Sequence, residues 1–129
     1  MIGLRLENGL PIVSFSYTYQ EKTIELRNVL FDTGCASTIF DTDLLANIGL
    51  YLDLINGTAK RMYGVGGASE LCYEQLVENL QIGTIILPSF KLQLGMTRDP
   101  YGFDGILGID FMTAVGLKVD FKNMNVEIA

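Results

Sequence analysis

Short runs of apolar and β-branched residues, separated by turn-forming residues, recur along most of the chain. Such runs are typical of β-strands bounded by turns. The clearest predicted strands cover residues 12–19, 23–31, 81–87, 90–94, 117–121 and 126–128. Because many short strands follow one another closely, we expect a mostly β fold whose sheet is closed or folded over on itself.

Two segments carry helix signals instead. Asp41 is a candidate N-cap, an acid follows in the first turn, and Gly49 provides a stop, which together predict a short helix over residues 41–48. Residues 110–115 repeat these signals, with Asp110 as the candidate N-cap and Gly116 behind the last turn. Each segment follows a glycine-containing stretch that arrives from a predicted strand.

One stretch, residues 69–80, is ambiguous between helix and strand. Leu71, Leu76 and Leu80 fit a helical period moderately well, and a strand fits no better. The choice matters because the glycine-rich segment 64–67 stands just before this stretch. A glycine loop that leads into a helix can cradle a phosphate, whereas between two strands it is the tip of a hairpin.

Composition narrows the possible chemistry. The chain has 129 residues, 49% of them hydrophobic, and no linker or low-complexity tract, which predicts one domain over residues 1–129. It contains no histidine and only two cysteines, Cys35 and Cys72. These counts exclude Ser-His and Cys-His nucleophile pairs, histidine-ligated zinc and four-cysteine zinc. Any catalysis must therefore use carboxylates, hydroxyls, a thiol, amines or backbone amides.

The charge balance bears on partners and location. Fifteen acidic residues against nine basic ones give a net charge of -6, the wrong sign for neutralising a phosphate backbone, so we expect no nucleic-acid partner. The N-terminus lacks the basic and apolar regions of a signal peptide, and no apolar stretch approaches the roughly 18 residues that span a bilayer. We therefore expect no membrane association and a cytoplasmic location.

The first candidate site is Asp32-Thr33-Gly34, which follows the apolar end of a predicted strand. A carboxylate there would lie at the edge of the core. The N–H groups of a tight glycine turn and the Thr33 side chain could fix its orientation. The plainer interpretation is an aspartate that only caps the turn after a buried strand.

The second motif is Gly64-Val65-Gly66-Gly67. Its glycines permit positive φ angles and remove side chains that would block a ligand. No Lys-Ser/Thr pair follows and the G-x-G-x-x-G spacing is absent, so the segment is neither a P-loop nor a dinucleotide-binding fingerprint. A flexible surface hairpin is the plainer interpretation.

The third motif, Gly105-Ile106-Leu107-Gly108, places two branched apolar residues between glycines. This pattern predicts a buried strand that passes close to another backbone, with Gly108 leaving room for the crossing. The aspartates on either side of it, Asp104 and Asp110, are expected in structural positions, a turn and a helix N-cap.

The order of these three motifs, with a short helix behind the third, resembles the retropepsin-like aspartic proteases. The resemblance covers about residues 22–122, and the string at residues 103–108 is also similar to a segment of the two-lobed, pepsin-type enzymes. It implies a mostly β, closed or folded-over barrel of the acid-protease type. One or two short helices, a flap hairpin and a homodimeric assembly belong to the same expectation.

The resemblance also implies roles for single residues. Asp32 would be the catalytic carboxylate, Thr33 would bond across to the partner chain, and Gly34 would permit the turn and offer its backbone to substrate. Ile106 would line a subsite, while residues 107–108 would pack beneath the catalytic loop.

The glycine-rich segment would then be the flap. Backbone amides of Gly64, Val65, Gly66 and Gly67 would hold an extended peptide or protein substrate, and the chain from Ser69 onward would be the returning flap strand. The phosphate-binding alternative survives only if that returning stretch is a helix.

The chemistry of this family needs two carboxylates, and the chain has a single Asp-Thr-Gly, because residues 41–43 lack the glycine. We therefore expect a homodimer in which Asp32 of each copy meets at the two-fold axis, with no metal or cofactor. The alternative is a catalytically idle dimerisation or peptide-binding domain on the same fold.

Three features depart from the family pattern. Cys35 stands where alanine is common, and a packed thiol is the expected role. Ala36 and Ser37 stand where retroviral members carry two acids, which removes a substrate-facing charge and an inter-subunit ion pair. The tail through Ile128 runs past the usual terminal interface strand. Together these departures predict a different dimer interface.

Overall fold

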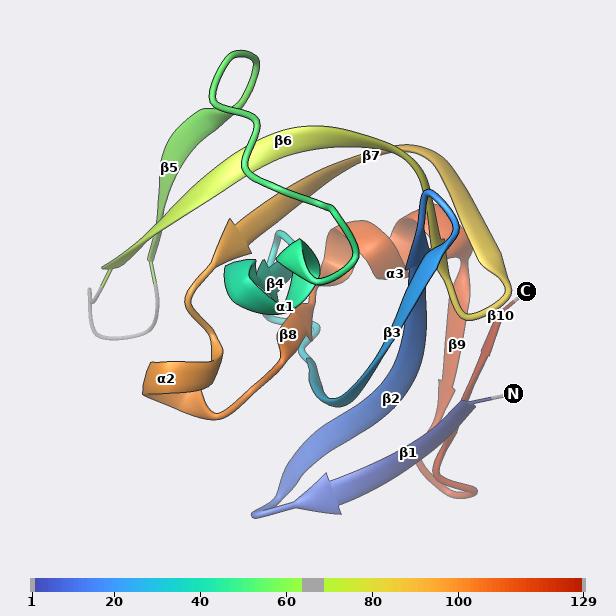
Figure 1. Ribbon diagram of the computed structural model, residues 1–129. Coiled ribbons are helices and arrows are strands. Elements are labelled where there is room, and N and C mark those ends of the chain that lie inside the picture. The colour runs from blue at the N-terminus through green and yellow to red at the C-terminus, as the bar shows by residue number, and fades with distance from the viewer. Residues whose placement is uncertain (1, 64–68, 129) are drawn as a thin grey trace.

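The computed structural model describes residues 2–63 and 69–128, so the predicted flap segment, residues 64–67, lies outside the described residues. Over the described ranges the chain forms ten strands and three short helices (Figure 1). In chain order these are β1 Ile2–Glu7, β2 Leu10–Tyr19, β3 Lys22–Phe31, β4 Ile39–Asp41, α1 Thr42–Ala46, β5 Thr58–Tyr63, β6 Ser69–Ile82, β7 Ile85–Gly95, α2 Arg98–Tyr101, β8 Gly105–Leu107, α3 Ile109–Val115, β9 Leu117–Asp120 and β10 Asn125–Ile128.

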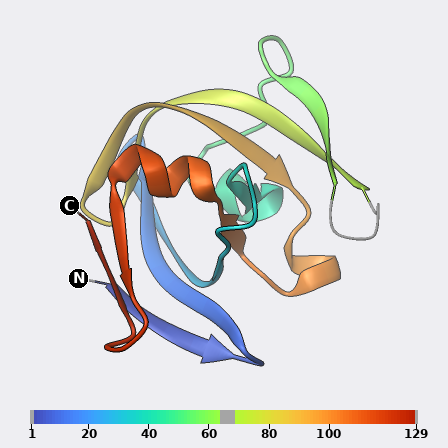
Figure 2. The same cartoon turned by 180° about the vertical axis from the view of Figure 1, so that it is seen from behind.

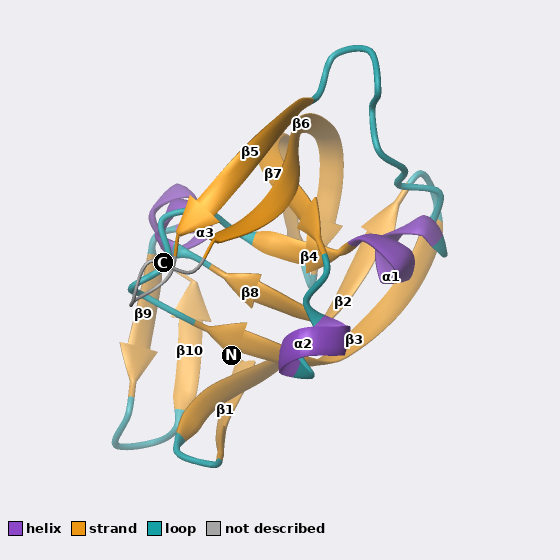
Figure 3. Ribbon diagram, turned by 90° about the vertical axis from the view of Figure 1, so that its left-hand side faces the viewer, coloured by secondary structure: helices purple, strands orange, loops and turns teal. Residues whose placement is uncertain are grey.

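The strands of the described ranges belong to one sheet, in the order β5-β6-β7-β4-β8-β3-β2-β1-β10-β9. A further pairing joins the end of β6 to β2, with Tyr17 opposite Ile82, so the sheet closes on itself. Figure 3 shows β5, β6 and β7 on one side of the molecule and β1, β9 and β10 on the other, with β4 and β8 between them. The predicted mostly β, folded-over architecture is confirmed.

Strand β6 resolves the ambiguous stretch. It pairs antiparallel with β5 as far as Tyr63 opposite Ser69, and along its length with β7. The chain from Ser69 onward is therefore the returning strand of a hairpin, as predicted. The phosphate-binding interpretation of the glycine segment required a helix here and is removed.

The prediction of one strand over residues 81–87 is wrong. A tight turn at residues 83–84 divides it into the end of β6 and the start of β7, with Ile82 opposite Ile85. Gly83 has a φ of 60°, and its N–H donates to the carbonyl oxygen of Ser16 at 2.8 Å. The apolar residues on both sides of the turn make two strands look like one continuous run.

Both predicted helices are present, although α1 ends at Ala46 rather than at residue 48 and one cap differs. The described residues hold three helices rather than one or two, because the four-residue helix α2 was not predicted. Asp41 caps α1 as expected, since its carboxylate accepts a hydrogen bond from the Leu44 N–H at 3.3 Å. The N-cap position of α3 is Gly108, whereas Asp110 lies in the first turn, so the N-cap prediction for Asp110 is wrong. Strand β1, which the sequence pattern does not single out, pairs with β2 and β10 near both chain ends (Figure 2).

Aromatic side chains from distant parts of the chain form the centre of the core. Tyr17 packs edge-on against Phe40 with ring centroids 4.6 Å apart. Phe111 of α3 makes similar contacts with Phe15 and Phe90, at 6.4 Å and 6.5 Å. All five rings are buried, and edge-to-face pairs add to the stabilisation from burial alone. Helix α3 is thereby fixed against the inner face of the sheet.

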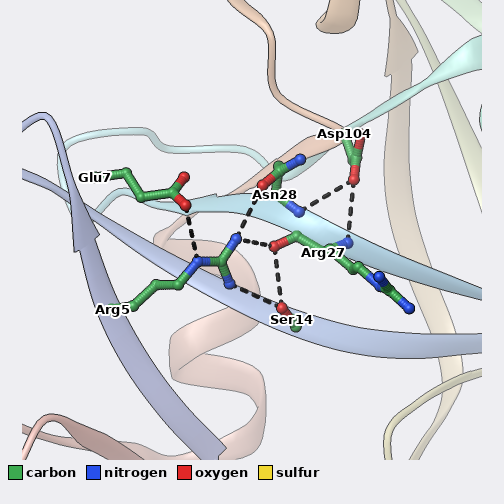
Figure 4. A network of polar contacts seen from close by, with 6 residues as sticks. All are labelled: Arg5, Glu7, Ser14, Arg27, Asn28 and Asp104. Carbon is green, nitrogen blue, oxygen red and sulfur yellow. Dashed lines mark hydrogen bonds and ion pairs between the residues drawn. The ribbon is translucent and has the colours of Figure 1, made fainter.

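A polar network holds β3, the strand that leads into the Asp-Thr-Gly motif (Figure 4). Arg5 of β1 donates to Ser14 Oγ and to Asn28 Oδ1, each at 2.9 Å, and to the carbonyl oxygen of Arg27. Asp104 Oδ2 accepts from the N–H groups of Arg27 and Asn28, both at 3.1 Å. Asp104, expected only as a turn residue, thus anchors the backbone of β3.

Among the helices of the described residues, none has the length and apolar character needed to cross a membrane.

Candidate active site

The Asp32 loop, residues 32–38, begins where β3 ends and lies beside β8. Strands β3 and β8 run parallel, with Phe31 opposite Leu107, and the Asp32 N–H donates to the Leu107 carbonyl at 3.0 Å. The Gly34 N–H donates to Asp32 Oδ1 at 2.9 Å, and the Cys35 N–H donates to the Asp32 carbonyl at 3.2 Å. A tight turn therefore holds the half-buried carboxylate in one orientation.

Thr33 and Gly34 are both exposed at the outside of this turn. Over residues 2–63 and 69–128 the Thr33 hydroxyl forms no side-chain hydrogen bond within its own chain. Its hydroxyl is accordingly accessible, and the predicted bond to a partner chain stays a prediction.

Residues of β8 and the start of α3 pack beneath the loop, as the third motif predicts. Leu107 is fully buried. A Cβ atom at Gly108 would lie 2.6 Å from the Cys35 carbonyl oxygen and 2.9 Å from the Ser37 carbonyl carbon. Both are backbone atoms, so only glycine lets the loop approach this closely. Ile106, the predicted subsite residue, is half-buried on β8.

The far end of the loop is held by a pair that sequence reasoning missed. Thr38 is fully buried, and both its N–H and its hydroxyl donate to the carboxylate of Asp110. The Thr38 hydroxyl in turn accepts from the Gly108 N–H at 3.0 Å. The sequence does show a polar residue, Thr38, directly before the apolar strand β4, which indicates a structural role. Nothing in the neighbouring sequence identifies Asp110 as its partner.

Asp41 and Asp110, which the sequence places in structural positions, do not offer a second catalytic carboxylate. Both oxygens of Asp110 accept hydrogen bonds from Thr38, and Oδ1 also accepts from the Phe111 N–H at 2.7 Å. Asp41 is buried, and beyond capping α1 it accepts from the N–H groups of Thr97 and Arg98, each at 3.2 Å. These carboxylate oxygens are thus occupied by backbone N–H groups and by the Thr38 hydroxyl, as is usual for structural carboxylates.

The Cys35 side chain packs against the backbone of its own loop. It is half-buried, and its Sγ donates to the Ser37 carbonyl oxygen at 3.1 Å. Burial raises the pKa of the Cys35 thiol, and the carboxylates of Asp32 and Asp110 raise it further. A thiol with a raised pKa is a weak nucleophile at neutral pH, so these observations favour the packing role.

A cleft of about 430 Å³ opens beside the loop. Residues 34–37 form one wall, and residues 60–63 of β5 line it together with Glu74 and Gln93. The predicted flap residues Gly64, Val65, Gly66 and Gly67 follow β5 directly and lie outside the described residues. The strands on either side of them form the hairpin described above.

Comparison with known proteins decides the family. A sequence model of the family described as Aspartyl protease matches residues 17–111, more than half of the chain. The chain belongs to the aspartyl protease family. The match includes the Asp-Thr-Gly motif, the β5–β6 hairpin segment and the Ile106-Leu107-Gly108 motif. No curated protein gives a significant match by sequence.

Two solved structures share the fold of this aspartyl protease family member. The crystal structure of a retropepsin-like aspartic protease from Rickettsia conorii is 15% identical, with a TM-score of 0.59, over 93% of this chain and 84% of that chain. The retroviral protease-like domain of Ddi1 from Leishmania major is 14% identical, with a TM-score of 0.55, over 91% and 87%. The retropepsin-like fold that the motifs implied is thereby confirmed.

Proposed function

We propose that this chain is a homodimeric aspartic endopeptidase, folded as one domain over residues 1–129, that hydrolyses peptide bonds with Asp32. The observation that carries the proposal is the setting of Asp32. Its carboxylate follows the buried end of β3, oriented by the Gly34 N–H at 2.9 Å, in a loop that borders a cleft. Family membership supports the same reaction class.

The second carboxylate comes from a second copy of the chain. The sequence contains one Asp-Thr-Gly, and the carboxylates of Asp41 and Asp110 are committed to backbone and hydroxyl donors. In a two-fold symmetric dimer Asp32 of each copy faces its mate. The exposed Thr33 hydroxyl is available to brace the two loops against each other.

The proposed mechanism follows from the pairing of two carboxyl groups. Two carboxylates in contact cannot both be ionised without strong repulsion, so one keeps a proton and the other acts as general base. The base takes a proton from a water molecule between them, and that water attacks the scissile carbonyl carbon. The protonated carboxyl donates to the carbonyl oxygen, and a proton is then delivered to the leaving amine. The pair titrates as a unit.

An extended peptide in the cleft is the proposed substrate. Main-chain hydrogen bonds to the Gly34 region on one side and to the hairpin residues 64–67 on the other would hold it, with Ile106 lining a subsite. The half-buried position of Ile106 on β8, next to the strand that carries Asp32, supports this role.

The test is cleavage of a randomised peptide library by the wild-type chain and by Asp32→Asn. Asparagine keeps an Oδ1 for the Gly34 N–H, so the variant should fold normally while its cleavage rate falls about 10²–10⁴-fold. Equal cleavage by both proteins would show that the reaction does not use Asp32. Peptide binding without cleavage by either protein would favour the idle, peptide-binding alternative.

A mixing experiment tests the dimer. When wild-type chains exchange with a fourfold excess of Asp32→Asn chains, roughly one wild-type chain in five finds a wild-type partner, so the activity per wild-type chain should fall about fivefold. Wild-type protein diluted to the same extent without the Asp32→Asn chains serves as the control. A monomer in sedimentation with full, Asp32-dependent activity contradicts the proposed assembly.

A further inference from the structure

The cleft beside the Asp32 loop contains a buried polar atom that finds no partner among the residues that the structure describes. Gln93, on β7, lines this cleft and is 3% exposed. Its N–H donates to the Thr38 carbonyl oxygen at 3.1 Å, so the residue lies directly against the end of the Asp32 loop. Within residues 2–63 and 69–128, its side-chain oxygen, Oε1, accepts no hydrogen bond. Unpaired buried oxygens are uncommon in folded proteins, which makes this one a candidate ligand contact.

The orientation of the Gln93 amide follows from its neighbours. Nε2 of Gln93 donates to Glu74 Oε2 at 3.2 Å, across the β6–β7 pair. The other oxygen of Glu74 is taken by Lys60 Nζ at 3.0 Å. Because a carboxylate only accepts hydrogen bonds, turning the amide over would bring two oxygens together. Gln93 Oε1 is therefore the free acceptor of this cluster.

A hydrogen-bond donor lies in the same cleft. The ammonium group of Lys60 has three N–H donors, of which Glu74 takes one, and its side chain is 50% exposed. Lys60 and Gln93 are connected through Glu74, so the acceptor and the donor belong to one cluster. A ligand group that both donates and accepts fits this arrangement.

We propose, on the basis of the peptidase function proposed above, that this cleft is a specificity subsite for a substrate side chain that ends in a carboxamide, asparagine or glutamine. The amide N–H of the substrate side chain donates to Gln93 Oε1, and its carbonyl oxygen accepts from Lys60 Nζ. Gln93 and Lys60 are then the residues that determine this preference.

Other side chains satisfy the cluster less well. A lysine or arginine side chain would donate to Gln93 Oε1 but meet the charges of Lys60 and Arg61, which also lines the cleft. A carboxylate would approach both Glu74 and Gln93 Oε1. An apolar side chain would leave Oε1 buried and unpaired, and a single hydroxyl is too small to occupy a cleft of about 430 Å³.

The experiment is selection from a displayed library of randomised peptides with Asp32→Asn protein, which binds without cutting. We expect enrichment in asparagine or glutamine at the peptide position that occupies this cleft and, since each copy of the dimer carries one cleft, at the symmetry-related position. In the Gln93→Met background, which keeps side-chain length and removes the acceptor, the preference for glutamine over leucine at that position should fall about tenfold or more. Lys60→Met, at a half-exposed position that tolerates substitution, should weaken the same preference.

A matched control is Gln81→Met on β6, outside the residues that line the cleft. Gln81 Nε2 donates to the Gly83 carbonyl oxygen at 2.9 Å, so this variant loses a glutamine hydrogen bond outside the proposed subsite. It should leave the peptide preference unchanged. Thermal unfolding of all the variants shows that each one is folded.

The outcomes separate this subsite from the peptidase proposal. Three outcomes would overturn the proposed subsite. They are that no peptide binds, that another class of side chain is enriched, or that Gln93→Met leaves the carboxamide preference intact. Cleavage of the selected peptides by the wild-type protein, which keeps Asp32, is measured independently. Asp32-dependent cleavage without carboxamide preference rejects the subsite and keeps the peptidase, and carboxamide selection without cleavage does the reverse.

Discussion

The carboxylate of Asp110 binds Thr38 through two hydrogen bonds, one from the threonine N–H at 3.0 Å and one from its hydroxyl at 2.7 Å. Thr38 ends the Asp32 loop and Asp110 lies in the first turn of α3. Hydrogen bonds to a charged acceptor are stronger than neutral ones, and those to a buried group are shielded from water. The pair therefore couples the loop to a helix that is itself anchored in the aromatic core.

Replacing Asp110 with alanine removes both bonds and leaves the buried Thr38 N–H without a partner. We expect the free energy of unfolding to fall by about 2–3 kcal/mol, measured by urea denaturation. Asp43→Ala is the matched control, because Asp43 is an exposed acid in the first turn of α1 and should cost less than about 1 kcal/mol. Equal losses of stability in the two variants would show that the Thr38–Asp110 hydrogen bonds contribute nothing beyond the effect of an acidic residue in the first turn of a helix.

Substituting Gly108 tests the close approach beneath the loop. A Cβ atom there would meet backbone atoms of Cys35 and Ser37 at 2.6–3.1 Å, so the loop must shift. Gly108→Ala should lower the free energy of unfolding by about 1–3 kcal/mol and reduce the proposed peptidase activity. Gly3→Ala, where nothing lies within 4 Å of the added atom, should be nearly neutral in both measurements. A neutral Gly108→Ala would mean that the loop is not held at this contact.

Tyr17 carries a hydroxyl group inside the hydrophobic core. The side chain is fully buried, and its Oη has no hydrogen-bond partner in the described part of the chain. Tyr17→Phe should therefore raise the free energy of unfolding by about 1 kcal/mol, since the ring contact with Phe40 is kept. Tyr19→Phe, at a half-buried site on the same strand, should change it by less than about 0.5 kcal/mol. Destabilisation by Tyr17→Phe would reveal a bond to this hydroxyl.

Alkaline pH should destabilise the fold. Burial raises the pKa of the Cys35 and Cys72 thiols and of the Tyr17 hydroxyl. Above about pH 8.5, where unfolded thiols lose their protons, the native state holds protons that the unfolded chain has released. The free energy of unfolding therefore falls as the pH rises.

Urea midpoints measured between about pH 7 and pH 11 check this prediction. In the Cys35→Ala and Cys72→Ala double variant the fall that begins near the thiol pKa should become shallower, while the fall caused by Tyr17, which begins near the ordinary tyrosine pKa of about 10, remains. A wild-type chain whose stability rises over this range would contradict the direction of all three shifts.

Much of the fold follows from local signals. The runs that predict β2, β3, β9 and β10 alternate or cluster over a few residues, and each strand appears within a few residues of its predicted bounds. The cap of α1 was predictable because Asp41 binds an N–H only three residues away. The turn at Gly83 escaped prediction because apolar residues flank it on both sides, which hides a break in the run.

The sequence by itself determined the motifs, their order and hence the family, since these depend on residue types at fixed separations along the chain. Only the tertiary structure decided which distant side chains meet. Asp110 reaches Thr38, and Gln93 reaches Glu74, because sheet closure and strand register bring separate segments together. Register depends on the packing of the whole core, so no local pattern around either residue encodes its partner.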